Sequence, residues 1–287
     1  MSTTLPKPAN RPQMPGPRPS TPGGFTQEPA PIQRSTLTVS TGAMQGVGQK
    51  VCIYGPGGVG KTSLAAIVSS VGLKPLFIDA EDSTKFLDVA RVAPQTWDEV
   101  RQILHSPDLL APYNVIVVES LTKLEDLANA WVCANIKHEK DKPIRGIEDF
   151  GYGKGYMHIY EAFLTLLGDL DAVARTGKHI ITTAHVNTES VPNPEGENWL
   201  QYQPRLQSPP KQGKVRERTK EWVDHLLFVD FDKAVSKDGR AIGHGSRTIY
   251  CAERPTYWAK SRSLADPVPY AKDDATIWQQ LFNKEKV

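Results

Sequence analysis

The sequence has 287 residues and a net charge of only +2 at pH 7, so its overall charge says nothing about nucleic acid binding. With 39% hydrophobic and 23% charged residues, the composition is that of a soluble globular protein. No apolar run approaches the ~18–20 residues of a membrane span, and no apolar signal-peptide core is present. We therefore expect a cytoplasmic protein that does not contact membranes.

Residues 1–34 are predicted to form a disordered, proline-rich tail. Proline fixes φ and lacks a backbone N–H, so neither a helix nor a sheet can propagate through such a segment. Nine of the 23 prolines fall there: Pro6, Pro8, Pro12, Pro15, Pro17, Pro19, Pro22, Pro29 and Pro31. Four basic residues against a single acid leave two interpretations open, a solvated tail or a weakly basic tether for DNA or a partner protein.

Residues 35–287 are predicted to form one α/β domain, because short apolar strands alternate with longer helices. Strands are expected at Val51–Tyr54, Leu76–Ile78, Val115–Val118, His179–Thr183 and Leu226–Val229. Helices are expected after the first strand, through about Ser70, and over the amphipathic residues 156–174. This alternation implies right-handed crossovers and a mainly parallel sheet with helices on both faces.

The C-terminal part is expected to extend the sheet with antiparallel strands. These strands are placed at Thr248–Cys251 and Thr256–Lys260, and a terminal helix is placed from Asp273 to about Lys284.

A glycine-rich segment after the first strand, Gly55–Thr62, matches GxxxxGK[ST] at every fixed position. Glycines let backbone N–H groups surround phosphate oxygens, and the following helix points its positive end at the same anion. Lys61 can reach the β- and γ-phosphates, and the Thr62 hydroxyl can coordinate Mg²⁺. The sequence therefore predicts a site for a nucleoside triphosphate with magnesium. The residues expected around the nucleotide are Gly55, Pro56, Gly57, Gly58, Val59, Gly60, Lys61, Thr62 and Ser63.

Hydrolysis also requires a carboxylate near the metal, and such an acid usually closes an apolar strand. Glu119 follows Val115–Val118 and is the candidate metal ligand beside Thr62. Ser120 comes next, so the base that activates water comes from elsewhere, unless Glu119 serves in both roles. The run Ile78–Asp82 ends another strand with three carboxylates, at the edge where open parallel sheets build their sites. Alternatively, these acids only solvate a loop.

The order of these motifs resembles RecA-core proteins over residues 48 to about 264, and in particular the RecA-like single-strand annealing ATPases of bacteriophages. The resemblance is carried by residues 53–62, Ile78–Glu81, Glu119–Thr122, Tyr152–Gly155, Thr183–His185 and Ala259–Arg262. It implies a RecA-like ATPase domain that uses ATP. The glycine-rich loop by itself does not distinguish ATP from GTP. It also implies that Glu81 is the catalytic base and that His185 senses the γ-phosphate, although a strand-end histidine could equally cap or pack.

The same resemblance implies an assembly and a role. Lys260 and Arg262 match basic residues that reach into a neighbour's ATP site, so a homo-oligomer, either a ring or a filament, is expected. Segments after the third strand's helix and after His185 correspond to two mobile loops that hold DNA. The implied function is ATP-dependent binding and annealing of single-stranded DNA during phage recombination, in the host cytoplasm, with a single-strand binding protein as a further partner. The sequence departs from the family in using Glu119 where Asp is usual, and in lacking a RecA-type N-terminal oligomerisation domain.

The residue chemistry gives a separate reason to expect DNA. Residues 196–220 contain six basic side chains against two acidic ones, interleaved with aromatic residues, which suits phosphates and unpaired bases. The candidate DNA-binding residues are Lys154, Trp199, Tyr202, Arg205, Lys211, Lys214, Arg216 and Arg218. The alternative is a pair of solvated loops whose aromatic rings pack on the body. Two other functions stay open, a nucleotide-gated adaptor or loader that never grips DNA, and a translocating helicase.

Overall fold

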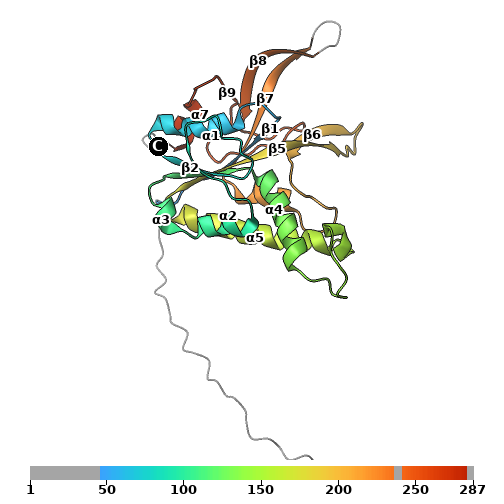
Figure 1. Cartoon of the computed structure of the whole chain (residues 1–287). Coiled ribbons are helices and arrows are strands. Elements are labelled where there is room, and N and C mark those ends of the chain that lie inside the picture. Colours follow the sequence, from blue (N-terminus) through green and yellow to red (C-terminus); the bar gives the residue numbers. More distant parts are fainter. Residues whose placement is uncertain (1–45, 236–240, 283–287) are drawn as a thin grey trace, which may run out of the picture. The chain divides into compact units, whose positions relative to one another are not determined.

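A mainly parallel sheet runs through the part of the chain that the computed structural model describes, residues 46–235 and 241–282 (Figure 1). The strand order is β3-β2-β4-β5-β1-β7-β8-β9, and β6 pairs with β5 outside this path. The strands are β1 (Lys50–Gly55), β2 (Pro75–Asp79), β3 (Ala90–Val92), β4 (Val115–Glu119), β5 (His179–Val191), β6 (Trp199–Pro204), β7 (His225–Val235), β8 (Ala241–Tyr250) and β9 (Val268–Pro269). Strands β3, β2, β4, β5, β1 and β7 are parallel, whereas β6, β8 and β9 pair antiparallel.

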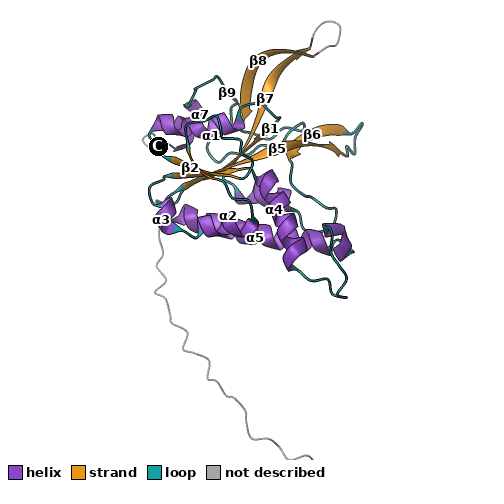
Figure 2. Ribbon diagram, in the orientation of Figure 1, coloured by secondary structure: helices purple, strands orange, loops and turns teal. Residues whose placement is uncertain are grey.

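Helices cover both faces of this sheet (Figure 2). They are α1 (Lys61–Ala66), which continues as the 3₁₀ helix η1 (Ile67–Val71), α2 (Trp97–Leu104), α3 (Pro107–Leu110), α4 (Leu121–Asn135), η2 (Ile147–Phe150), α5 (Lys154–Arg175), α6 (Val215–Trp222) and α7 (Thr276–Phe282). Helices α1 and α7 lie on one face, and α2, α4 and α5 lie on the other. None of the helices in the described ranges has the length and apolar content that a membrane crossing needs.

Strand β1 shows why the strands form a central layer. Its side chains alternate between the two faces, so Cys52 and Tyr54 join the core under α4 and α5 while Val51 and Ile53 join the core under α1 and α7. All four are fully buried. A strand that is buried on both faces reads as a continuous apolar run, which is the pattern that the sequence shows.

The predicted fold class is confirmed, a mainly parallel sheet flanked by helices with an antiparallel extension near the C-terminus. All five predicted parallel strands are present, and the long helix extends over Lys154–Arg175. The predicted tail, residues 1–34, lies outside the described residues.

Two predictions about the C-terminal part were wrong in detail. The segment Thr256–Lys260 makes only isolated bridges, at Tyr257 and Lys260, and is no regular strand. The last helix begins at Thr276 instead of Asp273, because Asp273 adopts a left-handed φ of 63° that a helix cannot contain. The Asp274 carboxylate then accepts a hydrogen bond of 2.9 Å from the Thr276 backbone N–H.

A buried histidine at the start of β7 makes stability depend on pH. His225 is 2% exposed, lies 2.9 Å from Gln49 Oε1 through Nε2, and lies 2.8 Å from Ser261 Oγ through Nδ1. Burial lowers the pKa of His225 from 6.5 to about 4. The unfolded chain therefore binds a proton at His225 more tightly than the folded protein does. The contribution of the neutral ring to the unfolding free energy is complete above pH 6.5 and is lost as the pH falls toward 4.

We therefore expect His225 to cost the wild type up to about 3 kcal/mol of unfolding free energy between pH 7 and pH 4. The variant His225→Gln does not titrate there, so the stability advantage of the wild type over this variant should shrink by that amount. Urea denaturation of both proteins at pH 7, 5.5 and 4 measures the difference. A difference that stays constant across this range contradicts the prediction.

Candidate nucleotide-binding and hydrolysis site

The predicted phosphate-binding segment connects β1 to α1 at the carboxyl edge of the sheet. Gly58 and Gly60 have φ angles of 74° and 98°, in the left-handed region where glycine carries no steric penalty. The ammonium group of Lys61 folds back over the loop and donates hydrogen bonds to the backbone oxygens of Gly55 at 3.0 Å and Pro56 at 2.9 Å. Burial lowers the pKa of Lys61, whose positive charge is therefore poorly solvated and available to an incoming phosphate.

The strand-end acid lies where the metal ligand was predicted. Thr62 Oγ1 donates a hydrogen bond of 3.1 Å to Glu119 Oε1. Glu119 is 3% exposed, and burial raises its pKa to about 7 against the opposing effect of the nearby Thr183 and Thr62 hydroxyls. Among the described residues, its Oε2 atom has no partner within regular hydrogen-bond geometry. A buried carboxylate oxygen without a partner is unfavourable, and a divalent cation would satisfy it. A hydroxyl and a carboxylate are oxygen ligands of the kind that Mg²⁺ prefers, so Thr62 and Glu119 fit the predicted metal.

The predicted base and the predicted sensor are in contact. Glu81 lies in the loop after β2, and its Oε1 atom accepts a hydrogen bond from Ser120 Oγ and lies 3.2 Å from His185 Nε2. The hydrogen bond from His185 lowers the pKa of Glu81, so this group is a carboxylate at neutral pH. A carboxylate held by two neighbours at the edge of a nucleotide pocket has the form that a general base requires.

The other two acids of this loop have different roles. Asp79 is 1% exposed and accepts hydrogen bonds from the Thr84 backbone N–H at 2.8 Å and the Thr84 hydroxyl at 2.6 Å. It therefore shapes the loop that presents Glu81. Asp82 is exposed to solvent.

A cavity of about 360 Å³ brings the predicted catalytic residues together. Its lining includes Lys61, Thr62, Glu81, Glu119 and His185, which come from α1, the loop after β2, the end of β4 and the middle of β5, where the parallel pairing of β5 with β1 ends. Residues far apart in the sequence thus converge at one edge of the sheet, as expected for parallel strands.

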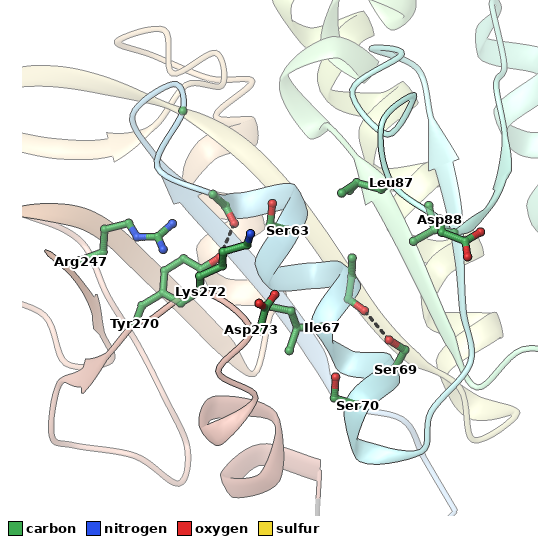
Figure 3. A pocket seen from close by; sticks show the side chains of 14 residues that line it. Ser63, Ile67, Ser69, Ser70, Leu87, Asp88, Arg247, Tyr270, Lys272 and Asp273 are labelled. Carbon is green, nitrogen blue, oxygen red and sulfur yellow. Dashed lines mark hydrogen bonds between the residues drawn. The ribbon is translucent and has the colours of Figure 1, made fainter. Parts of the chain in front are cut away.

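A second cavity of about 530 Å³ adjoins the first, and both are lined by Gly58, Gly60 and Ser63 (Figure 3). Its far wall is formed by Arg247 on β8 and Tyr270 just after β9. The sequence motifs do not indicate these two residues, because neither belongs to a local pattern and only the fold places them beside the phosphate-binding segment.

The predicted catalytic residues are connected to the segment that follows β6. The His185 backbone N–H donates a hydrogen bond of 3.0 Å to Thr122 Oγ1, and that hydroxyl donates one of 3.1 Å to the Arg205 oxygen. The Arg205 N–H donates back to the His185 oxygen at 2.8 Å. Further on, the Gln207 N–H donates a hydrogen bond of 2.7 Å to Glu125 on α4. Strand β5, helix α4 and residues 205–207 are therefore fixed to one another.

Three predictions about DNA contacts need correction. The segment after His185 is not a mobile loop throughout, because Val186–Val191 pairs antiparallel with β6. Arg216 is 7% exposed and its guanidinium donates hydrogen bonds to Glu189 at 2.9 Å and Gln203 at 2.6 Å, so it stabilises this ribbon from inside. The Tyr202 ring stacks on Phe228 with centroids 5.4 Å apart, which favours the alternative that it packs on the body.

The remaining predicted DNA residues are more accessible. Lys211, Lys214 and Arg218 are exposed and line a hollow of about 330 Å³ against the first turns of α5. At the start of α5, Lys154 pairs with Glu139 at 2.6 Å. Arg205 is exposed and Trp199 is partly buried. These residues stay candidates for DNA contact.

The two residues predicted to act on a neighbour lie at the opposite edge of the sheet from the phosphate-binding segment. Lys260 pairs with Leu226 at the start of β7, and its ammonium group donates to backbone oxygens at the end of α6, the shortest being Val223 at 2.7 Å. Arg262 forms an ion pair of 2.8 Å with Asp224. Neither residue reaches the nucleotide site of its own chain, so a role in a neighbour's site stays a prediction.

The fold and the site define a P-loop nucleotide-binding protein. A phosphate-binding loop follows a central parallel strand, and a strand-end carboxylate lies beside its threonine. A family model described as AAA domain, AAA_24, matches residues 47–263, and the chain belongs to this family. The match confirms the predicted P-loop ATPase core, whereas the bacteriophage affiliation stays a prediction.

Solved structures include two distant likenesses. A KaiC-like protein from Pyrococcus horikoshii is 14% identical with a TM-score of 0.41, and the match covers 78% of this chain and 86% of that one. The flagellar accessory protein FlaH from Methanocaldococcus jannaschii is 10% identical with a TM-score of 0.37, covering 71% and 77%. A search of curated proteins found no match.

Proposed function

We propose that this protein is a bacteriophage ATPase that binds and anneals single-stranded DNA and uses ATP to control its affinity for that DNA. The observation that carries the proposal is the continuous set of hydrogen bonds from Glu81 through His185 and Thr122 to Arg205. This set joins the hydrolytic residues to the segment that carries the exposed cations.

The site supports hydrolysis through the chain's own side chains. Backbone N–H groups of the phosphate-binding segment and Lys61 would hold the β- and γ-phosphates. Mg²⁺ between Thr62 and Glu119 would neutralise phosphate charge. The Glu81 carboxylate, held by Ser120 and His185, would take the proton of the attacking water.

The geometry also supports control of DNA binding by nucleotide. His185 is hydrogen-bonded to Glu81 by its side chain and to the segment after β6 by its backbone. A γ-phosphate that displaces the imidazole from Glu81 would therefore shift the middle of β5 and, through Arg205, the residues that follow β6. ATP binding and hydrolysis would thus switch β5 and the segment after β6 between two arrangements.

The surface around the N-terminus of α5 supports single-stranded DNA as the partner. Lys211 and Lys214 supply cations for phosphates, and Tyr152, which is fully exposed, supplies a flat face on which an unpaired base can stack. The Gln207 side chain donates to the Tyr156 and Gly213 oxygens at 2.8 and 2.7 Å, which holds the basic segment against α5.

Reversing two charges tests the proposal. The double variant Lys211→Glu, Lys214→Glu should weaken binding of a labelled oligo-dT about tenfold or more and flatten its salt dependence, because phosphate contacts are lost. The Kd for ATP should stay within about twofold. A matched control, Lys74→Glu with Arg175→Glu, changes the net charge equally at exposed positions elsewhere and should leave DNA affinity nearly unchanged.

Fluorescence anisotropy with a non-hydrolysable ATP analogue, at several salt concentrations, measures these affinities. No DNA binding by the wild type in either nucleotide state, or equal losses in variant and control, contradicts the proposal. Absence of DNA binding by the wild type favours the nucleotide-gated adaptor, whereas equal losses place the DNA contact away from Lys211 and Lys214.

A further inference from the structure

Three side chains from the C-terminal part of the chain donate hydrogen bonds to backbone oxygens of the phosphate-binding segment and α1. Arg247 donates to the Val59 oxygen at 3.0 Å, and the Tyr270 hydroxyl donates to the Gly60 oxygen at 2.9 Å. The Trp278 indole N–H donates to the Leu64 oxygen at 2.7 Å. Each donor comes from a different element, β8, the residue after β9, and α7.

The first two donors form a rigid pair, which we call the Arg247–Tyr270 brace. The Tyr270 backbone N–H donates to the Arg247 oxygen at 2.8 Å, and the guanidinium lies 4.1 Å from the centre of the Tyr270 ring. Tyr270 is 4% exposed, so its position is determined by packing. Figure 3 shows both side chains directed at the start of α1.

The brace lies directly against the segment. A Cβ atom added to Gly60 would lie 2.6 Å from the Arg247 guanidinium and 2.9 Å from the Tyr270 hydroxyl. Glycine at this position therefore permits the left-handed φ and also the close approach of the two donors.

The orientation of two peptide planes follows from these bonds. In a trans peptide the C=O and the next N–H point in opposite directions. Because Arg247 holds the Val59 oxygen toward itself, the Gly60 N–H of the same peptide points away from Arg247. The Gly60 oxygen accepts both the Tyr270 hydroxyl and the Leu64 N–H, at 2.9 and 2.8 Å, which orients the Lys61 N–H in the same way.

These orientations determine how well the loop binds an anion. A phosphate is held by N–H groups that point inward, and a carbonyl that turned inward would repel it. Gly58 and Gly60 give the loop access to both arrangements at low cost. A loop that is held in the binding arrangement loses less conformational freedom when the nucleotide arrives.

We propose that Arg247 and Tyr270 are positioning residues of the nucleotide site, which hold the Val59 and Gly60 carbonyls away from the phosphates so that the loop is preorganised for a triphosphate. The inference rests on the proposed function in one respect, that the loop binds a nucleoside triphosphate. Tyr270 and Trp278 lie beyond residues 47–263, so residues that support the nucleotide site extend past the part of the chain that matches the family model.

The variants Tyr270→Phe and Arg247→Gln test the brace. Tyr270→Phe keeps the ring and removes only the hydroxyl. We expect each variant to raise the Kd and KM for Mg-ATP roughly five- to tenfold, the effect of losing one hydrogen bond to the loop. The kcat should stay within about twofold, because the loop contacts substrate and transition state alike. The control Tyr257→Phe removes a hydroxyl from a ring that stacks on Phe228, outside the brace.

Binding is measured with a fluorescent ATP analogue, hydrolysis by phosphate release, and folding by thermal unfolding without nucleotide. A lower melting temperature with unchanged Kd and KM in Tyr270→Phe indicates a merely structural role and overturns the proposal, as do values equal to those of Tyr257→Phe. Wild-type protein that binds no nucleotide contradicts the proposed function, and the inference about the brace with it. Nucleotide binding without DNA binding contradicts the proposed DNA-binding function but not the positioning role of Arg247 and Tyr270.

Discussion

Replacing Glu81 with glutamine is expected to reduce the kcat for ATP hydrolysis by a factor of about 100 to 10,000, while the Kd for ATP stays within about threefold. The amide keeps the size of the side chain and can still contact Ser120 and His185, but it cannot take a proton from water. Binding is retained because the phosphates are held by the loop and Lys61. Phosphate release under saturating ATP, together with equilibrium binding, separates the two effects.

The variant Asp82→Asn is the matched control for this experiment, because it makes the same chemical change one residue further on, at an exposed position. It should hydrolyse ATP at close to the wild-type rate. If Glu81→Gln retains hydrolysis, Glu81 is not the base, and the remaining candidate base is Glu119, acting in both roles. If the two variants lose activity equally, the loss reflects the loop and not the carboxylate of Glu81.

The variant Glu119→Gln is expected to separate function from stability. Magnesium-dependent hydrolysis should fall about 100-fold or more, because the metal loses its only carboxylate ligand among the residues assigned to it. The melting temperature of the nucleotide-free protein should not fall, since the amide replaces a buried carboxylate whose Oε2 atom has no partner among the described residues. Hydrolysis titrated with Mg²⁺ and thermal unfolding without metal measure the two effects.

Asp126→Asn provides the comparison, since this exposed acid lies on α4 away from the cavity. Neither its magnesium dependence nor its melting temperature should differ much from the wild type. Wild-type magnesium dependence in Glu119→Gln contradicts the assignment of Glu119 as a ligand. A large fall in the melting temperature of that variant would show that the carboxylate stabilises the fold by contacts of its own.

Long-range contacts bear on two interpretations that the sequence left open. The three acids at and after the end of β2 look alike in the sequence, yet Asp79 accepts hydrogen bonds from its own loop while Glu81 contacts Ser120 and His185. His185 could have been a packing residue, but the parallel order of β2, β4 and β5 brings it to Glu81. Which carboxylate can act as a base thus depends on strand order, which no local pattern encodes.

The basic stretch shows the opposite case, in which a local pattern misleads. Arg216 belongs to the charge cluster by sequence position, but α6 turns it inward, where Glu189 and Gln203 satisfy its guanidinium. Lys211 and Lys214 come from the same stretch and stay exposed. Net charge along a segment therefore overestimates the charge that a partner can contact, because a buried arginine that is already paired is not available at the surface.

By itself, the sequence determined the phosphate-binding loop from Gly55 to Thr62, the apolar strands and the acid that ends β4. These features are local, since loop conformation, strand periodicity and ligand type all depend on neighbouring residues. Only the tertiary structure decided the contact between Glu81 and His185 and the support that Arg247 and Tyr270 give to the loop. These depend on pairing between segments that are distant along the chain, which is set by the packing of the whole sheet.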